Sequence, residues 1–180
     1  MDELRLRPLR PADGPGFAAW GLDRRFCEVA GWRLDRSLAG HEAHWRWVIA
    51  EPKADHLRLA AVLGEEVVGY VDFAGSEVGW RELGYVVGPS ARWGRGVGGA
   101  VARAGVEYGF GVLALREIRA EALDANVASV RILQSLGMTE TGRGEDDSFL
   151  GEPSFYRRFR LSKASADGTY ARVHKLAGGV

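Results

Sequence analysis

The 180-residue sequence contains one cysteine, two methionines and no excess charge of either sign. Because Cys27 has no partner for a disulfide, the chain suits a reducing compartment, and we predict a cytoplasmic location. Lysine plus arginine and aspartate plus glutamate each number 24, so the formal net charge is zero. This argues against a nucleic-acid binder with a basic surface. No apolar run approaches the roughly 18 residues of a membrane span, and residues 1–10 are too charged for a signal peptide. We expect neither a membrane nor a nucleic-acid partner.

Glycine is abundant, with 25 copies, and many of them lie in residues 82–110. This stretch begins with a strand pattern at 82–87, passes through a Gly-Pro turn into a loop with four glycines, and ends in a helix-forming segment at 100–110. Glycines let the backbone approach a ligand closely, and the unpartnered N–H groups at a helix start favour phosphate. Arg95 adds a positive charge. The stretch therefore predicts a site for a phosphorylated ligand.

Two common phosphate-binding motifs fit this loop poorly. GRGVGG at 94–99 matches the dinucleotide pattern G-x-G-x-x-G, but such a fingerprint lies at the end of its strand, usually the first of the domain. Here residues 88–93 intervene, and the preceding chain has strands joined by short turns. Glu117 lies at the distance of a ribose-binding acid, yet it falls in a strand pattern as a solvated residue. No Gly-Lys-Ser/Thr follows, so a P-loop is excluded. A nicotinamide-binding enzyme is therefore the least favoured hypothesis for this chain.

The run WGRGVG at 93–98 resembles the acyl-CoA pyrophosphate loop of the GNAT acetyltransferase superfamily, with the pattern Q/R-x-x-G-x-G/A. Trp in the first position is typical of the branch that includes ribosomal-protein N-terminal acetyltransferases. ELGY at 82–85 precedes the loop, an Asn-x-x-Ser (Asn126, Ser129) follows it, and Leu-Gly-Met closes that helix at 136–138. The resemblance covers roughly residues 4–161. It implies direct transfer of the acetyl group of acetyl-CoA to an amine, on a protein N-terminus or a small molecule, without a covalent enzyme intermediate.

Hydrophobic periodicity and turn signals predict the order of the elements. Strands are expected at 4–7, 56–62, 67–73, 82–87, 117–122 and 155–161, and helices at 13–29, 37–49, 100–110 and 126–136. Three sequential strands imply an antiparallel meander, and the strand–helix–strand passage from 82 to 122 implies a parallel pair. We predict an α+β (mixed α/β) fold with a mostly antiparallel twisted sheet flanked by helices. The resemblance further implies that the parallel pair splays around the CoA site. Residues 1–162 form the predicted GNAT domain and 163–180 a C-terminal tail.

The resemblance also implies which residues bind the co-substrate, acetyl-CoA. The pantetheine arm is expected to pair like an extra strand with the end of 82–87, where a backbone N–H polarises the thioester carbonyl. Asn126 is expected to contact this arm, although an asparagine there also suits a simple N-cap, and Ser129 faces the same way one turn later. The predicted cofactor-binding residues are Val86, Val87, Trp93, Gly94, Arg95, Gly96, Val97, Gly98, Gly99, Asn126 and Ser129.

Catalysis requires a base, since an ammonium cannot attack, and Glu82 is the predicted general base. Strand alternation places it on the same face as Gly84 and Val86; the alternative is a structural carboxylate at a strand end. Some N-terminal acetyltransferases carry a Tyr seven residues after the Asn, to protonate the leaving thiolate, and here that position is Leu133.

The general acid is therefore unassigned, with Ser129, Tyr156, Ser154 and water as candidates. The missing Tyr leaves a catalytically weak acyl-CoA-binding regulatory module as the second hypothesis.

The acceptor is not encoded in any recognisable pattern. By resemblance its site lies between the first two helices, the 75–81 turn and the 144–154 loop. The acidic residues of that loop suit a cationic acceptor or simply a solvated surface. His41 and His44 lack a third metal ligand, so we predict no metal, and the tryptophans of the second helix are interpreted as core. Cys27 is interpreted as packing. A homodimer is common in the family and is permitted here.

Overall fold

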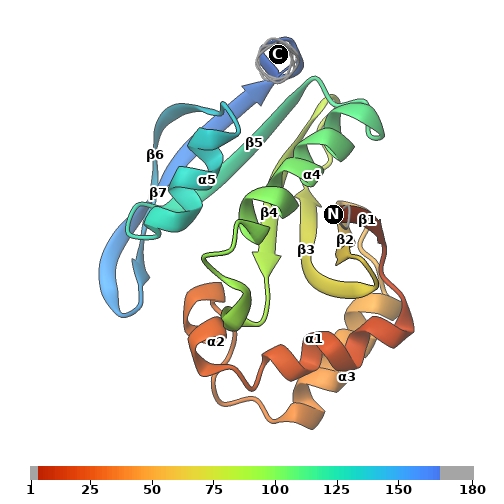
Figure 1. Ribbon diagram of the computed structural model, residues 1–180. Helices are drawn as coiled ribbons and strands as arrows, with labels where there is room; N and C mark the ends of the chain where they lie inside the picture. Colours follow the sequence, from red (N-terminus) through yellow and green to blue (C-terminus); the bar gives the residue numbers. More distant parts are fainter. Residues whose placement is uncertain (1–3, 167–180) are drawn as a thin grey trace, which may run out of the picture.

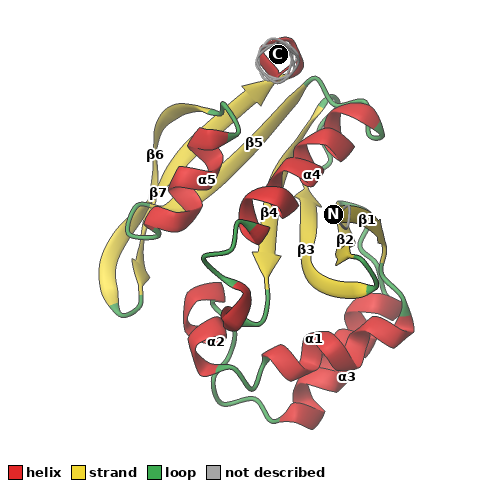
Figure 2. Cartoon of the chain, viewed as in Figure 1, coloured by secondary structure: helices red, strands yellow, loops and turns green. Residues whose placement is uncertain are grey.

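The computed structural model describes residues 4–166, in which strands and helices follow an order close to the predicted one (Figures 1 and 2). The strands are β1 (Leu4–Pro8), β2 (His56–Leu63), β3 (Glu66–Ala74), β4 (Trp80–Val87), β5 (Glu117–Leu123), β6 (Thr139–Phe149) and β7 (Glu152–Ser162). The helices are α1 (Gly14–Trp20), α2 (Arg24–Ala30), α3 (Leu38–Ala50), α4 (Val97–Gly111) and α5 (Val127–Ser135), with the 3-10 turns η1 (Pro11–Asp13) and η2 (Ser90–Arg92).

The strands form one sheet in the order β1-β2-β3-β4-β5-β7-β6. Neighbouring strands run antiparallel except β4 and β5, which are parallel because α4 carries the chain back between them. The predicted fold class is confirmed: a mixed α+β arrangement with a mostly antiparallel sheet, one parallel pair and flanking helices.

β4 and β5 pair at one end only. Their paired positions run from Trp80 to Glu82 on β4, and beyond Glu82 the two strands separate (Figure 1). β4 continues to pair with β3 as far as Val87, and β5 continues to pair with β7 as far as Leu123. The sheet therefore stays intact on both sides of an opening whose edges are the second halves of β4 and β5.

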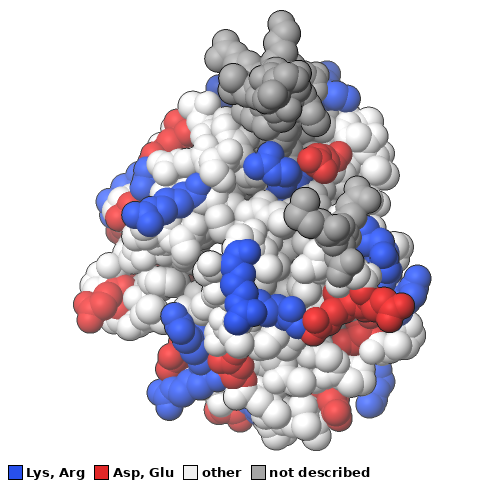
Figure 3. Space-filling view, in the orientation of Figure 1, with Lys and Arg blue, Asp and Glu red and all other residues white. Residues whose placement is uncertain are grey.

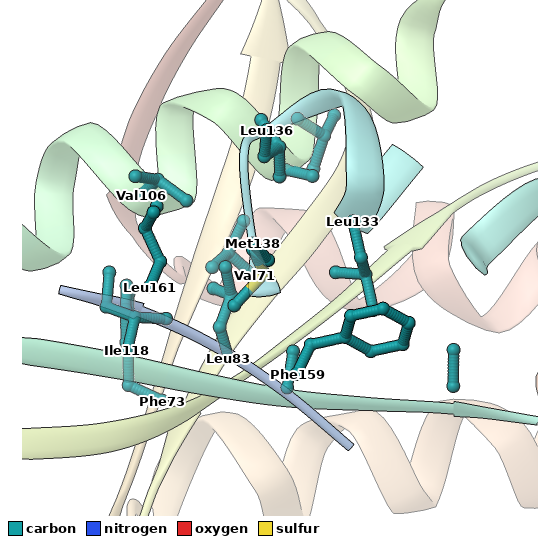
Figure 4. Packing of buried hydrophobic residues seen from close by; sticks show 14 of the residues in the cluster. Val71, Phe73, Leu83, Val106, Ile118, Leu133, Leu136, Met138, Phe159 and Leu161 are labelled. Atoms are coloured by element: carbon teal, nitrogen blue, oxygen red, sulfur yellow. The ribbon is translucent and has the colours of Figure 1, made fainter. Parts of the chain in front are cut away.

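Two apolar cores lie on opposite faces of the sheet. On one face, Val106 of α4 and Leu133 of α5 belong to a cluster with Leu83 and Ile118 of the strands (Figure 4). On the other face, α1 and α3 cover β2 and β3 with a cluster of aromatic rings. Burying one such side chain contributes about 1.5–3 kcal/mol. The α4–α5 core joins strands on both sides of the opening, such as Val71 of β3 and Phe159 of β7, whereas the aromatic core lies over β2 and β3.

Alternation along β4 sends its side chains to different faces, as predicted. Leu83 and Tyr85 pack with the α4–α5 core, whereas Val86 packs with the aromatic cluster on the opposite face. Glu82 shares the face of Val86, because it lies four residues before it on the same strand. The two faces of the opening are thus lined by different residues of one strand.

The predicted single helix at 13–29 is wrong, because α1 and α2 are separate. Asp23 is the N-cap of α2, and its carboxylate accepts a hydrogen bond from the N–H of Phe26 at 3.0 Å. Its second oxygen accepts from the N–H of Ser90 at 2.8 Å, in the segment after β4. This contact joins residues far apart in the sequence, so periodicity does not reveal it.

The predicted loop at 144–154 is also wrong. Most of it belongs to a hairpin of β6 and β7 closed by Leu150 and Gly151, which both have positive φ angles, 54° and 85°. The residues of β6 are nearly all exposed and polar, so no apolar alternation marks the strand in the sequence. Its backbone is held by pairing with β7 instead.

The predicted tail is described only in part. Residues 163–166 are helical, and Ala166 is buried in the α4–α5 core; the remainder of the tail lies outside the described residues. Within residues 4–166, no helix is long and apolar enough to cross a membrane. Basic and acidic side chains are interspersed on the face that carries α4 and α5 (Figure 3).

Candidate active site

The glycine-rich loop ends in the N-terminus of α4, which begins at Val97 and not at the predicted Ala100. Gly94 and Gly96 have φ angles of 74° and 80°, in the left-handed region that favours glycine. Gly96 is the N-cap and offers no side chain to cap the helix. The first N–H groups of α4, from Val97 to Gly99, therefore lack intrahelical acceptors. A 15-residue helix with this start is suited to bind an anion.

The two arginines in and beside the loop differ in their ion pairing. Arg92 forms an ion pair with Glu66 on β3. Arg95 is exposed and forms no ion pair with any residue in 4–166. Arg95 is therefore the basic side chain of the loop that is available to a phosphate.

Trp93 fixes the loop to the strand. Its indole Nε1 donates a hydrogen bond to the carbonyl of Val87 at 2.8 Å, and its ring packs against both apolar cores. The guanidinium of Arg25 lies 5.6 Å from the centre of this ring. Trp93 thus positions the loop at the end of β4 from within the protein.

α5 forms the side of the site next to this loop. A Cβ atom at Gly98 would come within 3.0 Å of Ile132 Cδ1, so the first turn of α4 lies directly against α5. Asn126 is the N-cap of α5, and its side chain accepts a hydrogen bond from the N–H of Ser129 at 3.2 Å. The predicted capping alternative for Asn126 is therefore observed, and its amide group also lies at the start of the helix that borders the opening.

One side chain links β4 with α5 beyond the point where β4 leaves β5. The hydroxyl of Tyr85 lies 3.0 Å from Oγ of Ser129 and 3.4 Å from the Ser129 carbonyl. Burial raises the pKa of Tyr85, and the hydrogen bond with Ser129 partly opposes this rise. The phenol therefore stays protonated at neutral pH.

Glu82 lies on the opposite face, where a cavity of about 420 Å³ opens beside the splayed strands. The cavity is lined by two carboxylates, Glu82 and Glu121, and by three arginines, with Trp80, Ala120, Thr141 and Phe159 completing the wall. The arginines are Arg119, Arg158 and Arg160.

These arginines form ion pairs with carboxylates other than Glu82. Arg158 donates to Glu121 at 2.8 Å, and Arg119 donates to Glu117 at 2.7 Å. Glu82 takes part in no ion pair with the residues that the structure describes. Desolvation by the surrounding protein raises the pKa of Glu82, the charge of Glu121 adds to the rise, and Arg158 opposes it. A carboxylate with a raised pKa and no partner suits a general base.

Tyr156 and Ser154 are already engaged by other groups. Tyr156 lies on the face of Glu82, and its hydroxyl donates to Asp147 at 3.2 Å. Burial, followed by this hydrogen bond, raises the pKa of Tyr156, and the charges of Glu121 and Glu82 add to the shift. Ser154 Oγ accepts a hydrogen bond from the N–H of Ala125 at 3.2 Å. Of the two, Tyr156 is the one that lies near the Glu82 cavity.

A family model for the acetyltransferase (GNAT) domain matches residues 3–139 of this chain. The chain belongs to the GNAT acetyltransferase family. The matched region runs from β1 to α5 and includes the glycine-rich loop, the opening and the N-terminus of α4. Family membership makes the chain an acetyl-CoA-dependent acetyltransferase.

Solved structures share the fold of this GNAT domain at low sequence identity. A spermidine N-acetyltransferase from Vibrio cholerae, in complex with CoA and spermine, has a TM-score of 0.75 at 17% identity, covering 91% of this chain and 98% of that chain. An aminoglycoside acetyltransferase in complex with coenzyme A has a TM-score of 0.73 at 19% identity, covering 93% and 99%. A putative acetyltransferase has a TM-score of 0.74 at 22% identity, covering 99% and 92%.

The helices predicted to flank the acceptor supply the aromatic core of the GNAT domain. Trp45 is 1% exposed and stacks on Phe17 at 4.3 Å between ring centres, so its interpretation as core is confirmed. Trp47, by contrast, is 52% exposed and is not core. His41 is buried, and burial lowers its pKa. Residues 4–166 contain no group of His, Cys, Asp or Glu side chains that is arranged to hold a metal ion.

The structure therefore divides the predicted site residues between two faces of one opening. Glu82 and Tyr156 lie on one face, and Asn126 and Ser129 lie on the other, with the loop at the end of β4. Tyr85 was not among the predicted site residues. Its position in ELGY, on the face opposite Glu82, was the only sequence feature that pointed to it. Only the tertiary structure shows which residue its hydroxyl contacts.

Proposed function

We propose that this GNAT acetyltransferase transfers the acetyl group of acetyl-CoA directly to the amine of a small molecule. The proposal rests above all on the opening between β4 and β5, which has free helix N–H groups near one end and Glu82 on one face. An anionic, elongated co-substrate and a basic acceptor can meet in such an opening.

For acetyl-CoA, the proposed contacts follow the order of the chain. The N–H groups from Val97 to Gly99 and the guanidinium of Arg95 bind the pyrophosphate. The pantetheine arm pairs with the edge of β4 near Val86 and Val87, which has no strand partner there among the described residues. Gly94, Gly96 and Trp93 give the loop its shape, and Asn126 borders the arm. A backbone N–H of β4 polarises the thioester carbonyl.

For the chemistry, Glu82 removes a proton from the acceptor ammonium, directly or through water. The amine nitrogen then attacks the thioester carbon, the carbon–sulfur bond breaks with its electron pair on sulfur, and the nitrogen releases its second proton to water. Ser129 lies on the far side of the opening from Glu82, so the base and the proton donor for the thiolate approach from opposite faces. Tyr156 lies on the base side, and we assign it to the acceptor and not to the thiolate.

For the acceptor, the volume of the Glu82 cavity fits a small molecule, since ligand sites begin at about 300 Å³. The solved neighbours named for spermidine and aminoglycosides act on amines of this kind. The WGRGVG run, in contrast, resembles that of enzymes acting on protein N-termini. The panel of acceptors to be tested therefore includes small-molecule amines and peptides with free N-termini. It also includes amino acids, whose carboxylates suit the three arginines of the cavity wall.

The first experiment is thermal unfolding with acetyl-CoA, CoA or NAD, followed by an acetyl-transfer assay. A ligand at about 100 times its Kd should add about 2.7 kcal/mol to the free energy of unfolding. We expect stabilisation by acetyl-CoA and CoA and acetylation of at least one small amine, with mass spectrometry identifying the product. Stabilisation without transfer to any amine would favour the acyl-CoA-binding module, and stabilisation by NAD alone would reject the proposal.

Two further predictions need other measurements. Sedimentation of the purified chain tests the predicted homodimer, and fractionation of the native cells tests the predicted cytoplasmic location.

A further inference from the structure

The hydrogen-bonded pair of Tyr85 and Ser129 bridges the two sides of the opening. Tyr85 stands on β4, three residues beyond the last position paired with β5, and Ser129 stands in the first turn of α5. Their hydroxyl oxygens are 3.0 Å apart, and either one can donate the proton. The pair therefore lies beside the route proposed for the pantetheine arm, on the face opposite the Glu82 cavity.

Both partners are held in place by other parts of the fold. Tyr85 packs against the α4–α5 core, and the N–H of Ser129 is bonded to the Asn126 side chain at 3.2 Å. Ile132, one turn after Ser129, contacts the start of α4 at Gly98. The serine hydroxyl is thus fixed relative to both the strand and the phosphate-binding helix start.

The other candidates for a general acid are less well placed. Leu133 is 1% exposed in the core and has no proton to give. Tyr156 lies on the Glu82 face and is bonded to Asp147, and Ser154 is bonded to the backbone of Ala125. Neither has a hydrogen bond to β4 among the described residues, as Ser129 has through Tyr85.

We propose that Tyr85 positions Ser129 as the proton donor for the leaving thiolate and resupplies its proton. This inference rests on the proposed acetyl transfer. As the carbon–sulfur bond breaks, sulfur keeps the electron pair and takes the hydroxyl proton of Ser129. The serine oxygen takes the phenol proton of Tyr85, and the phenolate regains a proton from water. An aliphatic hydroxyl is a poor acid alone, so the phenol makes the transfer feasible.

The test is a double-mutant cycle on kcat with the best amine acceptor. Tyr85→Phe should lower kcat by about 10- to 100-fold, up to the lower limit of the range for general acid catalysis, because Ser129 keeps its own hydroxyl. The KM for acetyl-CoA and the Kd for CoA should change less than about twofold, because the phenyl ring remains. Ser129→Ala should lower kcat at least as much, and the double variant should match Ser129→Ala, since the relay is already broken. Ser129→Thr keeps a hydroxyl and should retain most of the activity.

Tyr108→Phe is the matched control. Tyr108 lies on α4 and packs against the same core, but its hydroxyl has no hydrogen-bond partner among the described residues. The kcat of the Tyr108→Phe variant should therefore equal that of the wild type. An unchanged kcat in Tyr85→Phe, or a double variant whose loss is the product of the two single losses, would overturn the relay. A wild-type chain that acetylates no amine would instead overturn the proposed function and the inference with it.

Discussion

β4 meets its two neighbouring strands in very different ways. On the β3 side it is paired from Glu82 to Val87 without interruption, and Gly69 of β3 lies so close that a Cβ atom there would be 2.3 Å from the Val86 carbonyl oxygen. On the β5 side pairing stops at Glu82. One strand thus has a closed edge that builds the core and an open edge that borders the site.

The contrast shows how an opening can exist within a stable sheet. The α4–α5 core contains strand residues from both sides of the gap, and the residues that border the gap contact helices instead of a strand. Side-chain bonds from Trp93 to Val87 and from Tyr85 to Ser129 tie the open edge of β4 to the loop and to α5. The stability of the domain therefore does not depend on closing the gap.

The largest expected effect is on the chemistry at the open edge. Glu82→Gln should lower kcat/KM by about 10²- to 10⁴-fold, because the acceptor ammonium loses its base. The raised pKa of Glu82 means that folding disfavours its ionised form, so the variant should not unfold more easily at neutral pH. The wild-type rate should rise with pH through this pKa, and the variant should lose that limb. Glu107→Gln, exposed on α4, is the control and should keep wild-type kinetics.

A second variant attacks the closed edge. Gly69→Ala should lower the free energy of unfolding by about 1–3 kcal/mol, because the new methyl group has no room against the Val86 backbone. Gly84→Ala is the comparison within the same strand pair, since its Cβ would meet Asp72 Cβ at an ordinary 3.6 Å. Urea unfolding of both variants measures the difference. Equal stability of the two would contradict the close packing on the β3 side.

A third variant separates loop shape from helix stability. Gly96→Ala places a side chain at a φ of 80°, which costs about 1–2 kcal/mol, and the distorted loop should weaken CoA binding about tenfold. Calorimetric titration with CoA gives the affinity. Gly111→Ala, at the other end of α4 and with nothing within 4 Å of its new methyl group, should bind CoA normally. Equal affinities would show that the loop does not bind the co-substrate.

The smallest expected effect concerns the charge around the base. Glu121→Gln removes a carboxylate that raises the pKa of Glu82 and frees Arg158, which lowers it. Both changes act in the same direction, so the acid limb of the pH–rate profile should move to lower pH by about 0.5 unit. Movement to higher pH would show that Glu82 is not the group that titrates.

Several features followed from local sequence alone. Ser37 and Asn126 cap the helices they were expected to begin, and Gly137 follows α5 with a φ of 79°. The strands of the meander and the glycine-rich loop before α4 also lie where their patterns place them. Each of these features depends on the conformational preferences of a few neighbouring residues, so it can be predicted from one sequence.

Other features needed the whole chain. Asp23, at the break between α1 and α2, accepts a hydrogen bond from the distant Ser90, and the backbone of β6 is held by pairing with β7. The sequence by itself determined the class of the sheet, the glycine-rich loop before α4 and the face on which Glu82 lies, because periodicity and glycine conformation are local properties. Only the tertiary structure decided where β4 leaves β5, which carboxylate raises the pKa of Glu82, and that Tyr85 meets Ser129. These depend on side chains brought together from distant parts of the chain, and no local pattern records them.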